Sequence, residues 1–448
     1  MDTGDTAWIL VSTALVMLMT PGLALFYGGM VRAKSVINMM MMSFGALGVV
    51  SVLWIIFGYS VAYGESIGGI LGNPGDFFGL SGLLDSADGI PTLVDVGFQA
   101  MFAVITVALI SGSIADRANF WTWLVFAAIW MTVVYSPVAH WVWGVGGWIG
   151  DELGAVDFAG GTAVHINAGA AGLALALVLG RRRDFGKGSH RPHNLPLVML
   201  GAGLLWFGWF GFNAGSAYGA NVAAGVALVN TIGATAAAML AWLVVEKLRD
   251  GHATSLGAAS GVVAGLVAVT PACGALNPMM SIVLGIAAGV VCSLTVSLKF
   301  RLRYDDSLDV VGVHLVGGLV GTVAIGFLAT ADAPDGVDGL FFGGGLDLLG
   351  RQILGAVAVL AYSFVVTYAI GWVLQKTIGF RVEDDHEVVG VDRIHHGESG
   401  YEIGNEEVPD DVLARVEAPA AGAGAATAPP AASGRVLGSS EGGMSPAT

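Results

Sequence analysis

The sequence contains few charged residues and little cysteine. Asp, Glu, Lys and Arg make up only 12% of the 448 residues, against 55% hydrophobic residues, which is unlike a soluble globular domain. Cys273 and Cys292 lie in apolar stretches and lack metal-ligand spacing, so we expect neither a disulfide nor a cysteine metal site. The N terminus carries Asp2 and Asp5 but no early basic residue, so we expect no cleaved signal peptide.

Long runs without charge occupy most of the chain. Each of nine runs is long enough to cross a bilayer, and two of them can each form two spans, with turns predicted at 213–221 and 270–278. We therefore predict an all-α polytopic membrane protein with eleven transmembrane helices. The runs are 6–31, 35–64, 96–115, 118–150, 158–180, 195–245, 253–298, 310–331 and 352–375.

The basic residues fix an orientation. With the N terminus outside, every Lys and Arg except Arg351 falls in an inner loop or in the C-terminal segment, as the positive-inside rule requires. We predict a multi-pass cell-membrane protein with a cytoplasmic C terminus. The outer loops are acidic and the net charge is −15. The acidic loops either concentrate cations at a pore mouth or are the acidic surface typical of a protein from a salt-loving organism, and both interpretations stay open.

The same topology indicates an internal repeat. Five spans in residues 6–180 and five in residues 195–331 enter from opposite sides, which is a 5+5 inverted repeat, and residues 348–378 add one extra helix. Residues 1–378 form the predicted transmembrane domain. A polar segment follows at 379–407, and residues 408–448, rich in Ala, Pro, Gly and Ser, are predicted to be disordered.

Two histidines occupy equivalent places in the two repeats. His165 and His314 each follow a valine, and each has glycines four and seven residues later. Ionisable groups inside a membrane are costly and usually functional. Two neutral imidazoles can share one hydrogen bond, and their free edges can meet a small neutral solute or carry a proton. A buried structural pair and a metal site are the alternatives, but neither repeat supplies a third metal ligand.

Two carboxylates precede these histidines. Asp157 lies eight residues before His165, where a carboxylate can cap the first helical turn or bind a cation, and we favour the structural role. Asp309 opens the tenth span similarly and is also interpreted as structural.

An aromatic and hydroxyl set lies at the outer ends of other spans. Phe102, Trp143 and Ser216 would offer two ring faces and one hydroxyl to a small cation. The alternative is an ordinary aromatic belt at the membrane interface.

Six motifs together resemble the ammonium transporter family (Amt/Mep/Rh), in its Amt branch. They follow the family's order from residue 6 to about residue 402. The motifs occupy residues 26–29, 140–144, 157–167, 206–216, 305–314 and 396–399.

The resemblance implies a role for each candidate residue. Phe102, Trp143 and Ser216 match the outer ammonium recruitment site, and Phe102 with Phe212 matches a stacked phenyl gate. The paired pore histidines correspond to His165 and His314. A pore-lining tryptophan and the buried aspartate of the family correspond to Trp209 and Asp157.

The resemblance also implies an assembly and a partner. It predicts a homotrimer with one pore per subunit, and ammonium or ammonia as substrate with methylammonium as an analogue. The inner loops and residues 379–402 would be the docking surface of a PII-type signalling protein, which makes 379–407 a regulatory segment. No cofactor, metal or nucleic acid is expected.

The cost of moving a charge favours one mechanism. Placing a bare ion in a dry pore costs several kcal/mol even after relaxation, and about 20 kcal/mol in the idealised limit. Deprotonating ammonium at pH 7 costs only about 5 kcal/mol if lysine stands in for it. We expect ammonium to lose its proton near the gate, ammonia to pass the histidines, and the proton to cross separately rather than return outside. A sensor, an intramembrane enzyme and an Rh-like gas channel are the rival readings.

Overall fold

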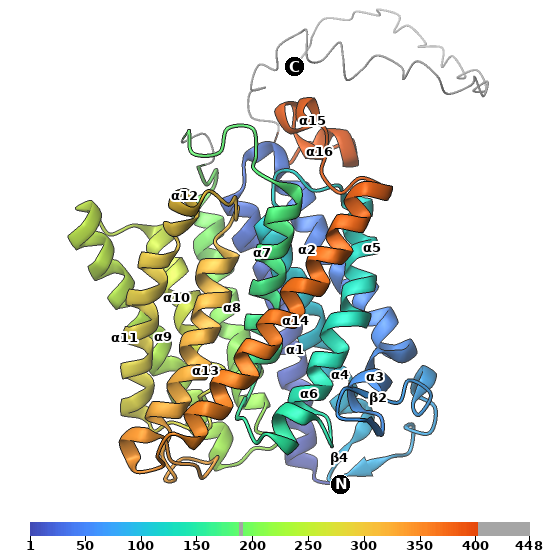
Figure 1. Ribbon diagram of the computed structural model, residues 1–448, viewed down its shortest axis with the longest axis vertical. Helices are drawn as coiled ribbons and strands as arrows, with labels where there is room; N and C mark the ends of the chain where they lie inside the picture. The colour runs from blue at the N-terminus through green and yellow to red at the C-terminus, as the bar shows by residue number, and fades with distance from the viewer. Residues whose placement is uncertain (188–190, 402–448) are drawn as a thin grey trace, which may run out of the picture. The chain divides into compact units, whose positions relative to one another are not determined.

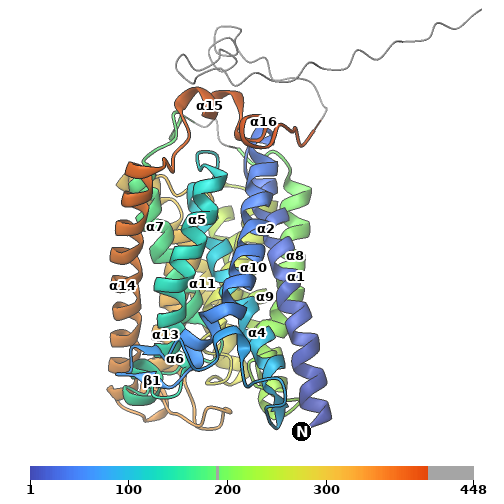
Figure 2. The same cartoon turned by 90° about the vertical axis from the view of Figure 1, so that its right-hand side faces the viewer.

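The computed structural model describes residues 1–187 and 191–401. These residues form a bundle of long helices, shown from two sides in Figure 1 and Figure 2. The N terminus lies at one end of the bundle, here called the N-terminal end, and the last two short helices lie at the opposite end. Part of the predicted 379–407 segment, residues 402–407, and the whole predicted 408–448 tail lie outside the described residues.

The long helices follow one another in two sets and a final helix. The first set is α1 (Thr3–Met30), α2 (Val36–Leu53) with α3 (Tyr59–Tyr63), α4 (Thr92–Ile110), α5 (Phe120–Trp130) with α6 (Ser136–Trp143), and α7 (Asn167–Leu179). The second set is α8 (Leu195–Gly215), α9 (Val222–Asp250), α10 (Ser255–Val269), α11 (Pro278–Thr295) with α12 (Leu298–Leu302), and α13 (Val316–Leu328). The last long helix is α14 (Asp347–Thr377), followed by α15 (Asp384–Val389) and α16 (Val391–His396).

Short elements join or extend these helices. Five π-helical segments are η2 (Trp54–Gly58), η5 (Met131–Tyr135), η6 (Trp148–Glu152), η7 (Gly161–Ile166) and η8 (Val311–Leu315). The 3₁₀ turns are η1 (Ala33–Ser35), η3 (Phe78–Leu80), η4 (Ser111–Ile114) and η9 (Leu340–Phe342). Two small antiparallel pairs, β1 (Ser66–Ile67) with β2 (Leu71–Gly72) and β3 (Ala87–Asp88) with β4 (Ile90–Pro91), fold the loop between α3 and α4.

The helices have the length and surface of membrane spans. Within the described ranges, ten helical segments are apolar and at least 18 residues long. Large apolar side chains such as Leu10, Val52, Phe207 and Leu240 are exposed on their outer sides, which suits contact with lipid. The protein is therefore a multi-pass membrane protein. Each predicted span contains a helix, but α10 has only 15 residues, so the count of eleven spans stays a prediction.

Polar caps start α8, α9, α10 and α11 of the second set. The side chains of Asn194, Asn221, Thr254 and Asn277 each accept a hydrogen bond from a backbone N–H in the first turn that follows. These N–H groups have no partner inside the helix, and a short side-chain acceptor at this position satisfies one of them. The caps explain why the two longest apolar runs divide where the predicted turns lie.

A buried ion-pair cluster holds loops together at the end opposite the N terminus. Arg182 contacts Asp305 at 2.8 Å and Asp116 at 2.9 Å, and Arg117 donates to the backbone oxygen of Asp305. Burial alone would raise the pKa of Asp305, but hydrogen bonds from Arg182 and the charge of Arg117 outweigh it and lower that pKa to about 2. Burial of these charged side chains is compensated because opposite charges lie close together and form additional hydrogen bonds.

The described part of the C-terminal segment packs on this same end. The carboxylate of Asp392 in α16 accepts hydrogen bonds from the backbone N–H of Ile37 and Asn38, at the start of α2. Tyr401 lies with its hydroxyl 2.9 Å from Nε2 of His193. The segment is thus joined to the start of α2 and to the loop that precedes α8.

The two sets meet where α1 packs against α8, and glycines permit the close approach. A Cβ added to Gly201 would lie 2.6 Å from Cα of Phe26 and 2.7 Å from the backbone oxygen of Gly22. Gly203 on the same helix is exposed and would meet nothing within 4 Å.

We expect Gly201→Ala to destabilise the protein because the new methyl group must push α1 and α8 apart. Overpacking of this kind costs about 1–3 kcal/mol. Thermal unfolding of the purified protein in detergent should show a lower Tm for Gly201→Ala, while Gly203→Ala stays close to the parent. Equal Tm values for the two variants would contradict a tight contact between these helices.

Candidate functional site

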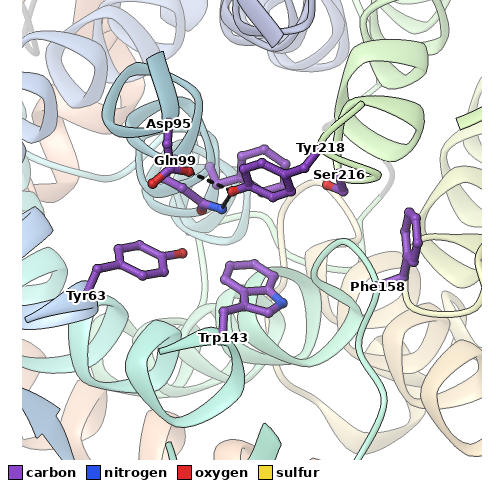
Figure 3. Close-up of a pocket in the computed structure, with 8 residues that line it drawn as sticks. Tyr63, Asp95, Gln99, Trp143, Phe158, Ser216 and Tyr218 are labelled. Atoms are coloured by element: carbon purple, nitrogen blue, oxygen red, sulfur yellow. Dashed lines mark hydrogen bonds between the residues drawn. The ribbon is translucent and has the colours of Figure 1, made fainter. Parts of the chain in front are cut away.

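A cavity of about 400 Å³ opens among the helices near the N-terminal end of the bundle. It contains the three predicted recruitment residues, Phe102, Trp143 and Ser216, which come from α4, α6 and the end of α8. Figure 3 shows how side chains from several helices surround it. The full lining is Tyr63, Asp95, Gln99, Phe102, Trp143, Phe158, Ser216 and Tyr218.

Aromatic rings close the inner side of this cavity. The rings of Phe102 and Phe212 are stacked, with centroids 4.2 Å apart and planes 28° apart. Trp143 meets Phe102 edge-on at 6.0 Å, and its indole N–H donates to the backbone oxygen of Asp157 at 3.0 Å. The Ser216 hydroxyl donates to the backbone oxygen of Phe212 at 2.8 Å, which leaves its lone pairs available to a donor in the cavity.

The predicted histidine pair lies directly behind the phenyl stack. The His165 ring is 6.1 Å from the Phe212 ring, and its Nδ1 lies 3.3 Å from Nδ1 of His314. A hydrogen bond between two Nδ1 atoms requires one ring to donate and the other to accept. Nε2 of His165 is buried without a partner among the described atoms, so this ring edge is free for a small molecule.

Trp209 forms one wall beside the pair. Its ring is stacked on His165 at 5.4 Å and 16°, and its indole N–H donates to the Thr270 hydroxyl at 2.8 Å. The Thr270 hydroxyl also lies 3.2 Å from Oδ1 of Asn213, and Asn213 donates to Thr231 at 2.9 Å. This buried network fixes the indole plane, because each polar group has a partner on a different helix.

Both histidines lie in π-helical turns that precede short α-helices. His165 is in η7 and His314 is in η8, and these turns continue as α7 and α13. A π-turn holds an extra residue and is common at functional sites. The equivalent local geometry agrees with the repeat predicted from the two Val-His pairs.

Asp157 holds the start of η7 in place. Its Oδ1 accepts from the N–H groups of Gly160 and Gly161, and its Oδ2 accepts from those of Thr162 and Ala163, at 2.7–3.1 Å. Gly160 has a φ of +119°, a conformation that favours glycine. The carboxylate therefore satisfies four backbone donors, as expected of a structural cap.

The corresponding cap in the second repeat is Asp306, and the expectation that Asp309 opens this span in the same way was wrong. Asp306 accepts from the N–H groups of Val310 and Val311. Asp309 has a φ of +63° and pairs with Lys299 at 2.6 Å, so it supports the preceding loop. Asp157 and Asp306 each lie eight residues before the histidine, and this equal spacing was the sequence signal for the correct residue.

Several cavity residues escaped the sequence reasoning. Asp95 and Gln99 lie on the same helix as Phe102, at spacings of four and seven residues that share one helix face. This spacing was visible in the sequence. Tyr63 and Tyr218 lie on separate elements, and no local pattern connected them with α4.

These features define a multi-pass membrane protein with an aromatic cavity, a phenyl stack and a histidine pair in series. The family model described as Ammonium Transporter Family matches residues 7–401. The chain therefore belongs to the ammonium transporter family, whose members are transporters and not enzymes.

Individual relatives agree with this assignment. The ammonium transporter of Mycobacterium tuberculosis strain H37Rv is 57% identical over 433 residues, with 90% of this chain and 91% of the relative covered. The structure of Saccharomyces cerevisiae Mep2 matches with a TM-score of 0.81 at 35% identity, over 91% of this chain and 94% of that one. A Sensor Amt Protein matches with a TM-score of 0.80 at 28% identity, over 87% and 97%.

We expect Asp157→Ala to destabilise the protein by about 2–4 kcal/mol, because several backbone N–H groups lose their acceptor inside the protein. Denaturation in detergent measures this loss. Glu152→Ala, which removes an exposed carboxylate nearby, is the matched control and should change little. Unchanged stability of Asp157→Ala would show that the carboxylate is not the structural cap.

Proposed function

We propose that this transporter takes up ammonium by separating it into ammonia and a proton. The observation that carries the proposal is the order of groups along one path: an aromatic cavity with a hydroxyl, a stacked phenyl pair, and two hydrogen-bonded histidines. The cavity suits the ammonium cation, and the phenyl pair and the histidines suit neutral ammonia.

Capture of the cation takes place in the cavity. The electron-rich faces of Phe102 and Trp143 attract a small cation, and the Ser216 oxygen can accept one of its N–H bonds. The cavity retains enough polar lining to stabilise the charge before the narrow part of the path.

Loss of the proton occurs before the substrate passes the phenyl pair. The rings of Phe102 and Phe212 leave no polar partner for a charge, and carrying a bare ion across costs more than the roughly 5 kcal/mol needed for deprotonation at pH 7. Ammonia then passes His165 and His314, whose ring nitrogens can exchange hydrogen bonds with it. An ion that cannot lose a proton, such as potassium, is rejected at the same step.

The proton crosses separately in this proposal. Paired imidazoles can pass a proton between them, because each ring can donate at one nitrogen and accept at the other. Transport then moves one positive charge for each ammonium taken up. If the proton instead returned to the outside, transport would be electroneutral.

In the proposed orientation, the cavity faces the outside and α15 and α16 lie in the cytoplasm. The basic residues gather at the end that carries these two helices, which fits the positive-inside rule. There Lys34 and Arg32 donate to backbone oxygens of Val388 and Glu387. We propose that this end receives a PII-type regulator, and that the protein forms a homotrimer, for which native mass spectrometry should give three chains per particle.

Ammonium-jump currents in liposomes test the mechanism. We expect a saturable ammonium current for the parent protein, also seen with methylammonium and absent with potassium. His165→Ala and His314→Ala should reduce it at least tenfold, since the shared hydrogen bond and the route for the proton are lost. His252→Ala, an exposed histidine, is the matched control and should keep the current.

Other outcomes have distinct meanings. Internal alkalinisation without current would make the protein an electroneutral ammonia channel. An equal potassium current would contradict deprotonation. If a folded protein gave neither signal, a sensory role would be favoured. This outcome is included because the chain is similar to a Sensor Amt Protein.

Cysteine labelling tests the orientation. Cys273 and Cys292 are buried free thiols, so they give a low background. In intact cells, a membrane-impermeant maleimide should label Leu84→Cys at the N-terminal end. It should label Lys187→Cys, at the opposite end, only after permeabilisation. The reverse pattern would invert the proposed direction of transport.

A further inference from the structure

Two cavities near the N-terminal end share two of their lining residues. Asp95 and Tyr218 line the aromatic cavity, and they also line a second cavity of about 440 Å³. That second cavity is formed by Asp5, Gly89, Ile90, Thr92, Asp95 and Tyr218. A solute moving from the second cavity to the first would therefore pass the carboxylate of Asp95.

The Asp95 carboxylate is held by neutral donors. Its Oδ1 accepts from the hydroxyl of Tyr218 at 2.7 Å, and its Oδ2 accepts from the hydroxyl of Tyr59 at 2.9 Å. Asp95 takes part in none of the ion pairs formed within ranges 1–187 and 191–401. Each carboxylate oxygen can accept a second hydrogen bond, so the group retains acceptor capacity for a cation.

Gln99 adds a buried acceptor without a partner. Its side chain is only 7% exposed, and its Nε2 donates to the Tyr218 oxygen at 2.6 Å. The single hydroxyl proton of Tyr218 goes to Asp95, so Tyr218 can only accept from Gln99, and this fixes the orientation of the amide. Oε1 of Gln99 is then left buried and unpaired, which costs free energy unless a donor reaches it.

Tyr63 completes the set from the other side of the cavity. Its hydroxyl has no hydrogen-bond partner among the described atoms, and Figure 3 shows it pointing into the cavity. A donor in this space could therefore meet the Asp95 carboxylate, the Gln99 oxygen and the Tyr63 oxygen.

We propose that Asp95, Gln99 and Tyr63 form a carboxylate subsite that binds the ammonium cation before it reaches Phe102, Trp143 and Ser216. The proposal rests on the proposed uptake of ammonium and names a site that the aromatic set does not include. An ammonium ion has four N–H donors in a tetrahedral arrangement, and the subsite offers charged and neutral oxygen acceptors to them. Methylammonium keeps three of these donors and should also bind.

This subsite would affect the apparent affinity for ammonium more strongly than the maximal rate of transport. A cation over aromatic rings gains modestly at a partly exposed site, whereas a hydrogen bond to a carboxylate is stronger. The negative charge also raises the local concentration of cations at the entrance. The subsite would not affect the steps beyond the phenyl stack, because in the proposed mechanism the substrate there is already neutral ammonia.

Asp95→Asn tests the proposal, because it removes the charge and keeps the shape. Two measurements are needed on the full-length protein: the rise of Tm with ammonium chloride in detergent at constant ionic strength, and the ammonium-jump current in liposomes. We expect the half-saturating ammonium concentration to rise about tenfold in both. The maximal current should fall by a smaller factor.

Two further variants separate charge from structure. Asp95→Glu keeps the charge and should restore most of the affinity. Asp85→Asn removes an exposed carboxylate at the same end that lines neither cavity, and it should behave like the parent.

The proposal is overturned if Asp95→Asn leaves both half-saturation values unchanged, or if Asp95→Glu loses as much affinity as Asp95→Asn. Failure of the proposed uptake would look different. In that case the parent protein would carry no ammonium, although ammonium could still raise its Tm in a way that depends on Asp95.

Discussion

Backbone N–H groups at the start of a helix have no partner within that helix, and the hydrocarbon core of a bilayer offers none. The helices that carry the two histidines both begin among buried residues and therefore need an internal acceptor. The carboxylate of Asp157 meets four N–H groups, and that of Asp306 meets two. These contacts determine where η7 and η8 begin, and so where His165 and His314 lie. Trp209 and Phe212 pack against His165, and Phe102 stacks on Phe212.

The aromatic residues lie between the histidine pair and the cavity near the N-terminal end. Phe102 and Phe212 separate a cavity with polar walls from the histidine pair. The proposed loss of the proton at the phenyl stack rests on this contrast, because a cation would find polar partners in the cavity and none between the two rings. The proposed subsite at Asp95 extends this contrast toward the second cavity, because this carboxylate accepts hydrogen bonds from two tyrosines and has no basic partner in the described part of the chain.

Much of the site followed from sequence reasoning because its residues belong to strong local patterns. The two Val-His pairs lie in long apolar runs, and the structure brings their rings into contact. The assignment of the second cap failed because Asp305, Asp306 and Asp309 lie close together, and only the backbone conformation shows which one faces the helix start. Tyr63, Tyr218 and the shared face of Asp95 and Gln99 were missed, because their grouping depends on the packing of separate helices.

The sequence by itself determined the class of the protein and the family, because hydrophobic length acts locally along a chain and the family's motifs are local. Tertiary structure decided which polar groups share a cavity and which remain unpaired. Residues such as Gln99, Tyr63 and Trp209 acquire their hydrogen-bonding state from neighbours on other helices. Their chemistry depends on distances that only the packed bundle sets.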